Sequence, residues 1–211
     1  IDQIINAAKA QPESASPGIM PPLYEVVANI NSFNVSGMQF NDFDMRLSPL
    51  NNNLQLKLNA KELRAEVFIP SEQSSQPIRI NSDYLRLNFL EAETQQPSEK
   101  SSPEQLAWLT NLPAIEFECA DCKVSHYQLD KVSASLLGDG KKLLISELVV
   151  DKGDHILRTK GQWQNGLTAM SGELKSDDIG ALFNEFDITT TIKDSNANLN
   201  YQLNWQAAPY N

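Results

Sequence analysis

Two cysteines, Cys119 and Cys122, have the spacing in this sequence that most readily supports chemistry. A Cys-x-x-Cys pair can form a disulfide, a redox centre or half of a zinc site. A four-cysteine zinc site needs a second pair, and these are the two cysteines of the chain. His126 lies nearby, but a further ligand is not apparent. Redox centres of this type start a helix, whereas this pair lies between strand-like segments. A structural disulfide is therefore favoured over the other two interpretations.

The disulfide interpretation carries a geometric condition. In a straight strand, Cα atoms three residues apart are about 10 Å distant, beyond the roughly 7 Å that a disulfide can bridge. The sequence therefore predicts a tight turn at Ala120 and Asp121, because Asp favours turns. A bridge around so short a loop contributes about 2 kcal/mol in the chain-entropy model and persists in an oxidising compartment.

The other ionisable residues form no catalytic pattern. Neither His126 nor His155 has a Ser-His-Asp arrangement suggested by local sequence, and we expect both on the surface or on a strand face. Asp177 and Asp178 open a predicted helix, where acidic residues favour the first turn. The acidic residues at 42–44 and 151–154 do not have the spacing of a calcium loop. The sequence predicts a protein that is not an enzyme and that uses no metal or cofactor.

Composition limits the class of protein further. Apolar residues make up 41% of the 211 residues and charged residues 21%, as in folded globular proteins. The net charge of −10 and the lack of a basic stripe argue against nucleic acid, because phosphate binding needs clustered Lys and Arg. No run approaches the roughly 18–20 apolar residues of a membrane-spanning helix. The absence of an initiating Met and of a signal peptide fits a mature or trimmed chain, but the repeats described below favour a segment cut from a longer protein.

Most of the predicted elements are strands. Apolar and polar residues alternate, as in strands with one buried face. The alternation is clearest over residues 54–58, 63–69, 78–80, 85–89 and 199–205. Turn residues separate the strands, and glycine in Lys152-Gly153-Asp154 and Asn165-Gly166 supplies the positive φ of a hairpin. The predicted fold class is mainly β: a long twisted antiparallel sheet forming an open, repeat-like groove, with a few short helices.

Short helices and a linker divide the chain. Helices are expected around Ile4 to Ala10, from Pro103 to Asn111 after an N-cap at Ser102, and from Asp177 to Phe186 after an N-cap at Ser176. The predicted organisation is a short helix and connector (1–20), a first β repeat (21–92), a polar linker (93–103) and a second β repeat (104–211).

The division into two repeats depends on a constant offset. Nine apolar positions from Phe33 to Leu56 match nine from Cys122 to Ile145 at a spacing of 89 residues (124 minus 35, and 143 minus 54). The polar pair Asn41-Asp42 also falls opposite Asp130-Lys131. Repeats of this kind stack on their neighbours along one axis. We therefore expect an elongated sheet built from two divergent copies of one unit.

Residues 112–211 carry a set of distinctive segments: the stretch from Leu112 to Val132, Gly161-Gln-Trp163, Ser171-Gly172, the segment from Ser176 to Leu182, and Leu203-Asn-Trp205-Gln-Ala-Ala-Pro209. In these segments the sequence resembles the late periplasmic region of the YhdP family, a branch of the AsmA-like proteins. The sequence departs from the family where a Gly-rich turn is usual before the last strand, and at Ala208, where Gly is common. Residues 20–92 agree with the family at the level of pattern.

The resemblance implies a long protein of the Gram-negative envelope, anchored in the inner membrane outside this segment. Its periplasmic part would be a curved sheet forming a hydrophobic groove, along which phospholipid moves toward the outer membrane. The implied partners are phospholipid acyl chains, the remainder of the same chain and envelope proteins at either membrane. The groove candidates are apolar residues of the alternating strands. They are Leu54, Leu56, Leu58, Val67, Ile69, Leu85, Leu87, Phe89, Leu199, Tyr201, Leu203 and Trp205.

A different class of function explains the same alternation. The apolar strand faces could pack internally, as in a sandwich or beneath covering helices. The chain would then be a structural spacer or docking module of the cell envelope that binds no lipid. An open apolar trough favours lipid transfer, whereas an apolar side covered by other elements favours the spacer.

Overall fold

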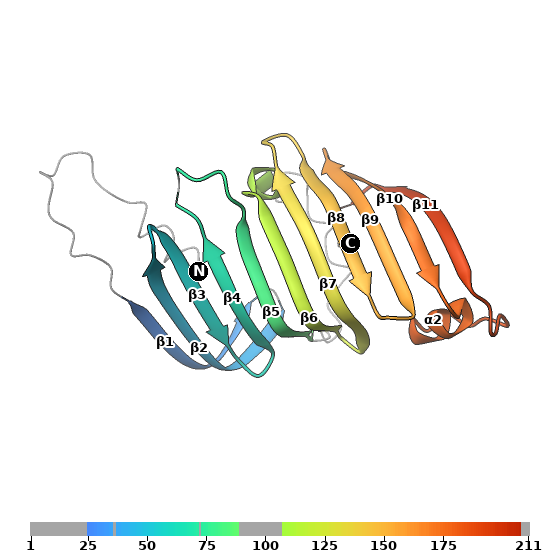
Figure 1. Cartoon of the computed structure of the whole chain (residues 1–211), viewed down its shortest axis with the longest axis horizontal. Coiled ribbons are helices and arrows are strands. Elements are labelled where there is room, and N and C mark those ends of the chain that lie inside the picture. The colour runs from blue at the N-terminus through green and yellow to red at the C-terminus, as the bar shows by residue number, and fades with distance from the viewer. Residues whose placement is uncertain (1–24, 36, 72, 89–106, 208–211) are drawn as a thin grey trace, which may run out of the picture.

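The chain folds into one open β-sheet, seen in a computed structural model that describes residues 25–35, 37–71, 73–88 and 107–207. The described residues form eleven strands, one 3₁₀-helix and one α-helix. All eleven strands belong to one sheet, in which each strand lies beside the next in sequence from β1 to β11 (Figure 1). The prediction of a mainly β, open sheet is confirmed.

The element bounds show how closely the strands follow the predicted alternation. They are β1 (Val26–Val35), β2 (Met38–Leu50), β3 (Asn53–Asn59), β4 (Leu63–Ile69), β5 (Ile78–Leu87), η1 (Ala107–Asn111), β6 (Ile115–Val124), β7 (Tyr127–Gly138), β8 (Leu143–Asp151), β9 (His155–Gln164), β10 (Leu167–Ser176), α2 (Ile179–Glu185) and β11 (Ala197–Trp205).

One strand pair departs from the predicted antiparallel pattern. β5 and β6 run parallel, with Ile78 beside Ile115 and Leu87 beside Val124. Parallel neighbours need a crossover connection, and here the connection between the two strands contains η1. The sheet continues through this pair, so one sheet crosses the boundary predicted between the two β repeats. Strands β6 and β10 each begin 89 residues after β1 and β5 (115 minus 26, and 167 minus 78). Descent from one duplicated unit stays a prediction.

Turns and bulges keep the alternation on one face. Gly153 and Gly166 both have φ of 78° in the hairpins after β8 and β9, so both predicted turns are confirmed. Asp42 in β2 also has a positive φ of 50°. Beyond it the apolar positions change from even to odd numbers, yet the Phe33 ring contacts both Phe40, by stacking, and Phe43, edge to face. Such irregularities re-aim side chains, and they also increase the local twist of a strand.

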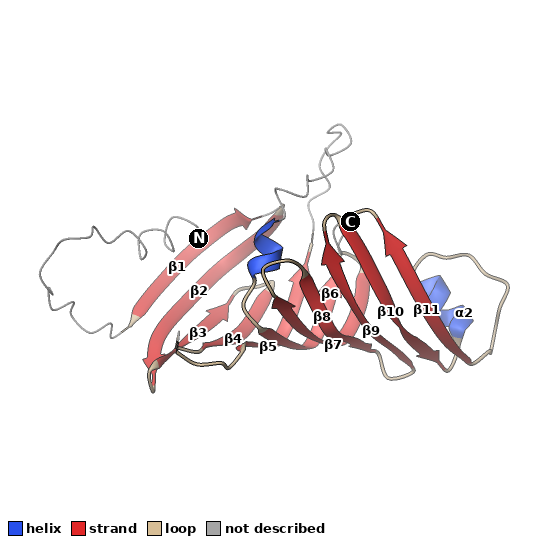
Figure 2. Ribbon diagram, turned by 90° about the horizontal axis from the view of Figure 1, so that it is seen from above, coloured by secondary structure: helices blue, strands red, loops and turns tan. Residues whose placement is uncertain are grey.

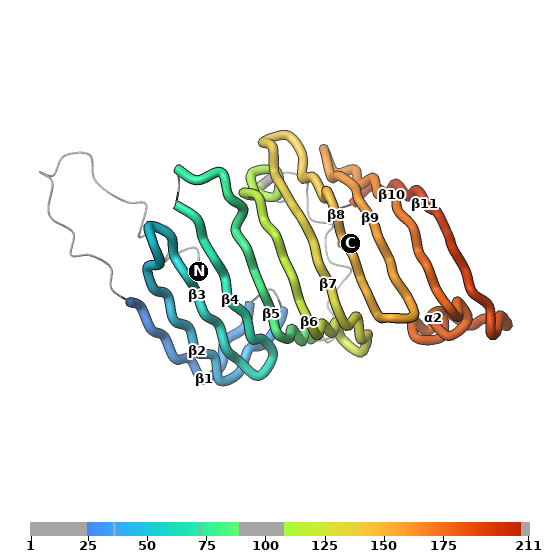
Figure 3. Tube along the Cα trace, viewed as in Figure 1, coloured from blue at the N-terminus to red at the C-terminus, as the bar shows by residue number. Residues whose placement is uncertain are grey.

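The sheet is curved as well as twisted. In Figure 2, β1 and β2 rise on one side of the middle strands and β9 to β11 rise on the other, and η1 lies within this bow. The Cα trace in Figure 3 shows the strands side by side in succession along the long axis of the molecule, with each strand running across that axis.

The helices differ from the predictions at their boundaries. Over its described residues the predicted helix at 103–111 is a 3₁₀-helix, Ala107–Asn111. The later helix begins at Ile179, and its N-cap is Asp178, whose carboxylate accepts hydrogen bonds from the backbone of Gly180 and Ala181. Ser176 is not the cap because it ends β10 and its hydroxyl contacts His155. The helix predicted at 4–10, its connector and the linker at 93–103 lie outside the described residues.

Candidate functional site: an apolar face across eleven strands

The strand register places apolar side chains in rows that cross the whole sheet. Residues that are partners on neighbouring strands share a face, and alternate residues along a strand share that face too. Two adjacent rows can be followed from β1 to β11. The Leu56 row is Val26, Leu47, Leu56, Val67, Ile80, Phe117, Ala134, Leu148, Thr159, Gly172 and Tyr201, and the Leu58 row is Ala28, Met45, Leu58, Ala65, Ser82, Cys119, Val132, Val150, Leu157, Leu174 and Leu199. We call the side of the sheet that carries both rows the apolar face.

Ser82, Thr159 and Gly172 are the residues of these rows that carry no apolar side chain, but they do not make the face polar. The Thr159 hydroxyl donates to the carbonyl oxygen of Ser171 at 3.1 Å. The Ser82 hydroxyl donates to the carbonyl oxygen of Tyr84 at 2.8 Å. Both hydroxyl groups are buried and satisfied by backbone, so neither needs water. Gly172 has no room for a side chain, since an added Cβ would lie 2.1 Å from the carbonyl oxygen of Arg158.

The other side of the sheet is charged and solvated. Arg46, Lys57, Glu66, Asn81 and Glu118 are successive partners across β2 to β6 on this side. All five are exposed, and Lys57 Nζ lies 3.1 Å from a carboxylate oxygen of Glu66. A shallow hollow of about 660 Å³ on this side is lined by residues of β1 to β5, including Arg46, Lys57 and Glu66. The two faces therefore differ in chemistry from β2 to β6.

Most of the apolar face lies at intermediate exposure. Leu47, Leu56, Ile80, Phe117 and Val132 are all half-buried. Further along, Leu199 and Leu203 on β11 are 44% and 54% exposed. Large apolar side chains in a closed core are usually fully buried. The described elements therefore leave much of this face uncovered.

Helical elements cover the apolar face near the strand ends of the second half. The buried Leu109 of η1 packs with Leu143 and Trp163, and Leu112 and Leu136 join this cluster. At the other ends of the strands, the backbone of Asp177, just before α2, donates to the carbonyl oxygen of Asp154 in the turn between β8 and β9. The Leu56 and Leu58 rows run between these two ends.

The register brings the predicted groove residues onto one face. Leu54, Leu56 and Leu58 alternate along β3 and face Ile69, Val67 and Ala65 on β4. The same face carries eleven of the twelve predicted groove residues. They are Leu54, Leu56, Leu58, Val67, Ile69, Leu85, Leu87, Leu199, Tyr201, Leu203 and Trp205. Phe89 lies outside the described residues, and contact of any of these side chains with lipid stays a prediction.

Sequence reasoning omitted other residues of this face, mostly from β6 to β10. Phe117, Val132, Leu157 and Leu174 all belong to the two rows. Register shifts interrupt the alternation in this half, between Cys119 and Cys122, for example, so a fixed period of two loses the phase. The signal that could have found these residues was the apolar residue type on both sides of each irregularity.

The cysteine pair forms a disulfide within a strand. The Cα atoms of Cys119 and Cys122 are 5.9 Å apart, and the two sulfur atoms are bonded. The predicted tight turn is wrong, because β6 continues unbroken through Ala120 and Asp121. A β-bulge at these two residues shortens the Cα separation and puts both cysteines on the apolar face. Both cysteines are buried there.

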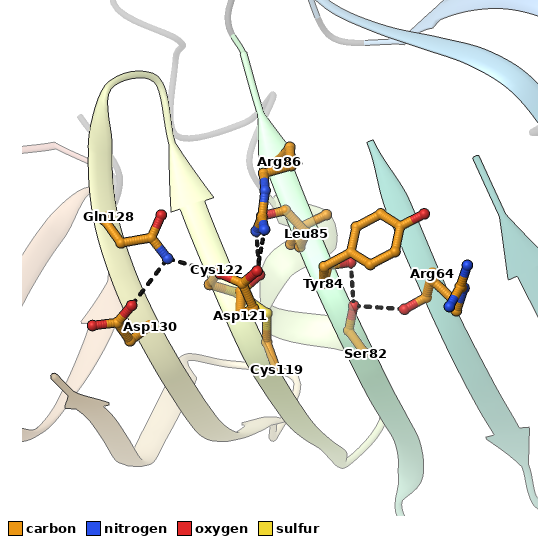
Figure 4. The surroundings of a disulfide bond; sticks show 10 residues. All are labelled: Arg64, Ser82, Tyr84, Leu85, Arg86, Cys119, Asp121, Cys122, Gln128 and Asp130. Carbon is orange, nitrogen blue, oxygen red and sulfur yellow. Dashed lines mark hydrogen bonds and ion pairs between the residues drawn. A yellow bond between two sulfur atoms is a disulfide. The ribbon is translucent and has the colours of Figure 1, made fainter. Parts of the chain in front are cut away.

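A polar network holds the opposite side of this bulge (Figure 4). Arg86 of β5 forms an ion pair with the carboxylate of Asp121. The Gln128 amide donates to Asp121 at 2.7 Å and to Asp130 at 3.0 Å. The Arg86 guanidinium and then the Gln128 amide hold the pKa of the Asp121 carboxyl below its ordinary value. The network therefore joins β5, β6 and β7 at the parallel strand pair.

The histidines occupy structural positions. His155 is buried on the apolar face, and its Nδ1 lies 2.8 Å from the hydroxyl of Ser176. His126 is exposed, with Nε2 at 3.0 Å from a carboxylate oxygen of Asp187. Within the described part of the chain, no group of three or more His, Cys, Asp or Glu side chains could hold a metal ion. The described helices include none that is long and apolar enough to span a membrane.

The fold and its two faces define a class of protein: an open, curved β-sheet with one charged side and one apolar side that continues across every strand. The model of the YhdP protein family matches residues 1–211, so the chain belongs to the YhdP family. The resemblance noted over residues 112–211 is thereby confirmed and extends to the whole chain.

A curated relative gives the family a described member. The chain is 25% identical over 183 residues to the intermembrane phospholipid transporter YhdP of Escherichia coli (strain K12). The match covers 83% of this chain and 14% of the relative, so the chain spans a small part of that protein's length. No solved structure matches the chain.

Proposed function

We propose that this chain is a periplasmic segment of a bridge-like lipid-transfer protein, whose apolar face carries phospholipid between the inner and outer membranes. The observation that carries the proposal is the pair of apolar rows that crosses all eleven strands. Family membership and the transporter named above support lipid as the cargo.

The proposed mechanism is physical and needs no catalytic residue. Acyl chains pack on the apolar face while the polar headgroup stays near water at its rim. Burial of each methylene is worth about 0.8 kcal/mol, so a two-chain lipid is held by any continuous apolar surface of sufficient area. The half-buried state of Leu56 and Leu58 leaves area that such chains can cover.

Movement along the face requires neighbouring sites of similar affinity. The two rows supply them, because each strand adds an aliphatic, aromatic or small side chain at the same level of the sheet. The largest local differences are at Ser82, Thr159 and Gly172, whose polar groups are satisfied or absent. A lipid moving from β1 toward β11 would therefore meet no buried, unpaired charge along these rows. In this proposal the rows continue into the remainder of the same long chain, which anchors the protein in the inner membrane and meets envelope partners.

The proposal is tested by native mass spectrometry and lipid extraction on the chain after export to the periplasm. We expect co-purifying phospholipid. Leu203→Glu should remove most of it, because a carboxylate on the apolar face opposes acyl chains. Gln202→Glu is the matched control, since Gln202 is the neighbouring residue on the opposite side of β11, and both positions are exposed.

The outcomes separate the two functional classes. Loss of phospholipid in Leu203→Glu but not in Gln202→Glu, with equal melting temperatures, supports lipid transfer on this face. A lipid-free wild-type chain that unfolds cooperatively would overturn the proposal in favour of a structural spacer or docking module. Equal loss in both variants would show that the apolar face does not hold the lipid.

A further inference from the structure

The 3₁₀-helix η1 is firmly attached to one edge of the apolar face. Its Leu109 is 5% exposed and packs against Leu143 and Trp163. The carbonyl oxygen of Thr110 accepts a hydrogen bond of 2.7 Å from the backbone of Gly140, and that of Leu112 accepts one of 2.9 Å from Gly138. The β7–β8 hairpin therefore holds η1 through both its side chains and its backbone.

The attachment depends on a glycine. A Cβ added to Gly138 would lie 2.4 Å from the carbonyl oxygen of Thr110 and 2.6 Å from the backbone nitrogen of Leu112. Backbone contacts this close leave no room for a side chain. The helix is thus a fixed part of the face, and whatever it presents to solvent has a defined position.

The residue that η1 presents to solvent is a tryptophan. Trp108 is 57% exposed, the highest value among the large apolar side chains that are exposed in the described residues. Its neighbour Leu109 already supplies the buried contact that attaches the helix. Because η1 is attached at one edge of the apolar face, the exposed indole of Trp108 lies near that edge.

An exposed indole at the border between an apolar surface and water has a characteristic partner. Tryptophan concentrates where hydrocarbon meets headgroups, because its ring is apolar and its N–H donates a hydrogen bond. Trp163, beneath η1, is four residues from Thr159 of the Leu56 row. Four residues of strand span about 13 Å, a distance that an acyl chain can cover.

We propose that Trp108 positions bound phospholipid at this edge, with its ring against the glycerol region and the first acyl methylenes. The acyl chains then run from η1 toward the Leu56 and Leu58 rows, and the headgroup remains at the helical edge. The inference rests on the proposed lipid-transfer function and deepens it, since it assigns an orientation to the lipid and a residue that sets it.

Tryptophan emission with brominated phospholipids tests this position. One probe is a phosphatidylcholine brominated near the glycerol, and the other is brominated near the chain ends. Trp205 lies on the apolar face itself, so the measurement is made in a Trp205→Phe background. There we expect stronger quenching by the first probe. Trp108→Phe should then remove most of the difference between the probes, because the remaining Trp163 is 2% exposed.

Affinity provides a second measurement. Trp108→Ala should weaken binding of a fluorescent phospholipid by about three- to tenfold, the loss expected for one aromatic contact. Leu137→Ala is the matched control, because Leu137 is 42% exposed but lies on the opposite side of β7. We expect that variant to bind as the wild type does, and both to keep the wild-type melting temperature.

The results distinguish failure of this inference from failure of the proposed function. If the wild-type chain binds neither probe, the lipid-transfer proposal fails, and the role of Trp108 fails with it. If the wild type binds lipid but Trp108→Ala binds equally well and Trp108→Phe keeps the probe difference, only the positioning role is overturned.

Discussion

The two halves of the sheet share one apolar face but cover it differently. In β1 to β5 the buried apolar residues are Phe40, Ala60 and Ala65. From η1 to β11 they are Leu109, Cys119, Cys122, Leu143, Ile145, Trp163, Ile179 and Leu182. The second half includes η1 and α2, whereas the described residues of the first half include no helix. The second half therefore builds a small core that the first half does not.

The polar groups on the apolar face follow the same division. The second half buries His155 against Ser176 near α2, and it buries Thr168, whose hydroxyl donates to the carbonyl oxygen of Ala207. The first half has Ser82 as its buried polar side chain among the described residues. A helix that covers the face excludes water, and the polar groups buried beneath it can satisfy each other's hydrogen bonds. The first half, whose described residues include no helix, keeps a mostly aliphatic and uncovered face.

Removal of the indole at the centre of the second-half core should have the largest effect. Trp163→Ala is expected to lower the free energy of unfolding by about 3–5 kcal/mol, because Trp163 is 2% exposed and its removal leaves a cavity under η1. Leu56→Ala in the half-buried first half should cost about 1–2 kcal/mol. Urea denaturation measures both, and equal losses would contradict the proposed difference between the halves.

The disulfide should contribute less than this core. Replacing both Cys119 and Cys122 with Ser is expected to cost about 2 kcal/mol, since the bridge closes a very short loop. Hydrogen exchange should then increase around β5 and β6, where the bulge lies at the parallel pair. If exchange increased only in β1 and β2, the bulge would not be what the disulfide stabilises. A reduced wild-type chain should behave like the double variant.

The cap of α2 should have a smaller effect. Asp178→Ala is expected to cost about 1 kcal/mol, because Asp178 accepts hydrogen bonds from the backbone of Gly180 and Ala181. Asp177→Ala is the control, as Asp177 is exposed and is not the cap. Thermal unfolding compares the two variants, and an equal shift in both would show that the cap does not secure α2.

Acid should weaken the network beside the disulfide by the smallest amount. Arg86 holds the pKa of Asp121 below its unfolded value, so this carboxylate stabilises the fold above that value and loses its contribution as the pH falls through the lowered pKa. Melting temperatures measured below about pH 4 should therefore fall less steeply in Asp121→Asn than in the wild type. Parallel curves would indicate that Asp121 titrates as in the unfolded chain.

The sequence by itself determined most of the strands and, within each regular strand, which side chains share a side. Alternation such as that of Leu199, Tyr201, Leu203 and Trp205 is local, and it decides which side chains share a side of a strand once the backbone is extended. Hairpin turns at Gly153 and Gly166 are also local, because a positive φ favours glycine at the position itself. These features needed no knowledge of the rest of the chain.

Only the tertiary structure decided how the strands combine. The parallel pairing of β5 with β6 depends on a connection whose path no local pattern fixes. The bulge at Ala120 and Asp121 depends on the partner strands on both sides of β6, and it is what allows Cys119 and Cys122 to meet. The position of Trp108 depends on the docking of η1 against Gly138. Register and docking are non-local, because they are set by contacts between residues far apart in sequence.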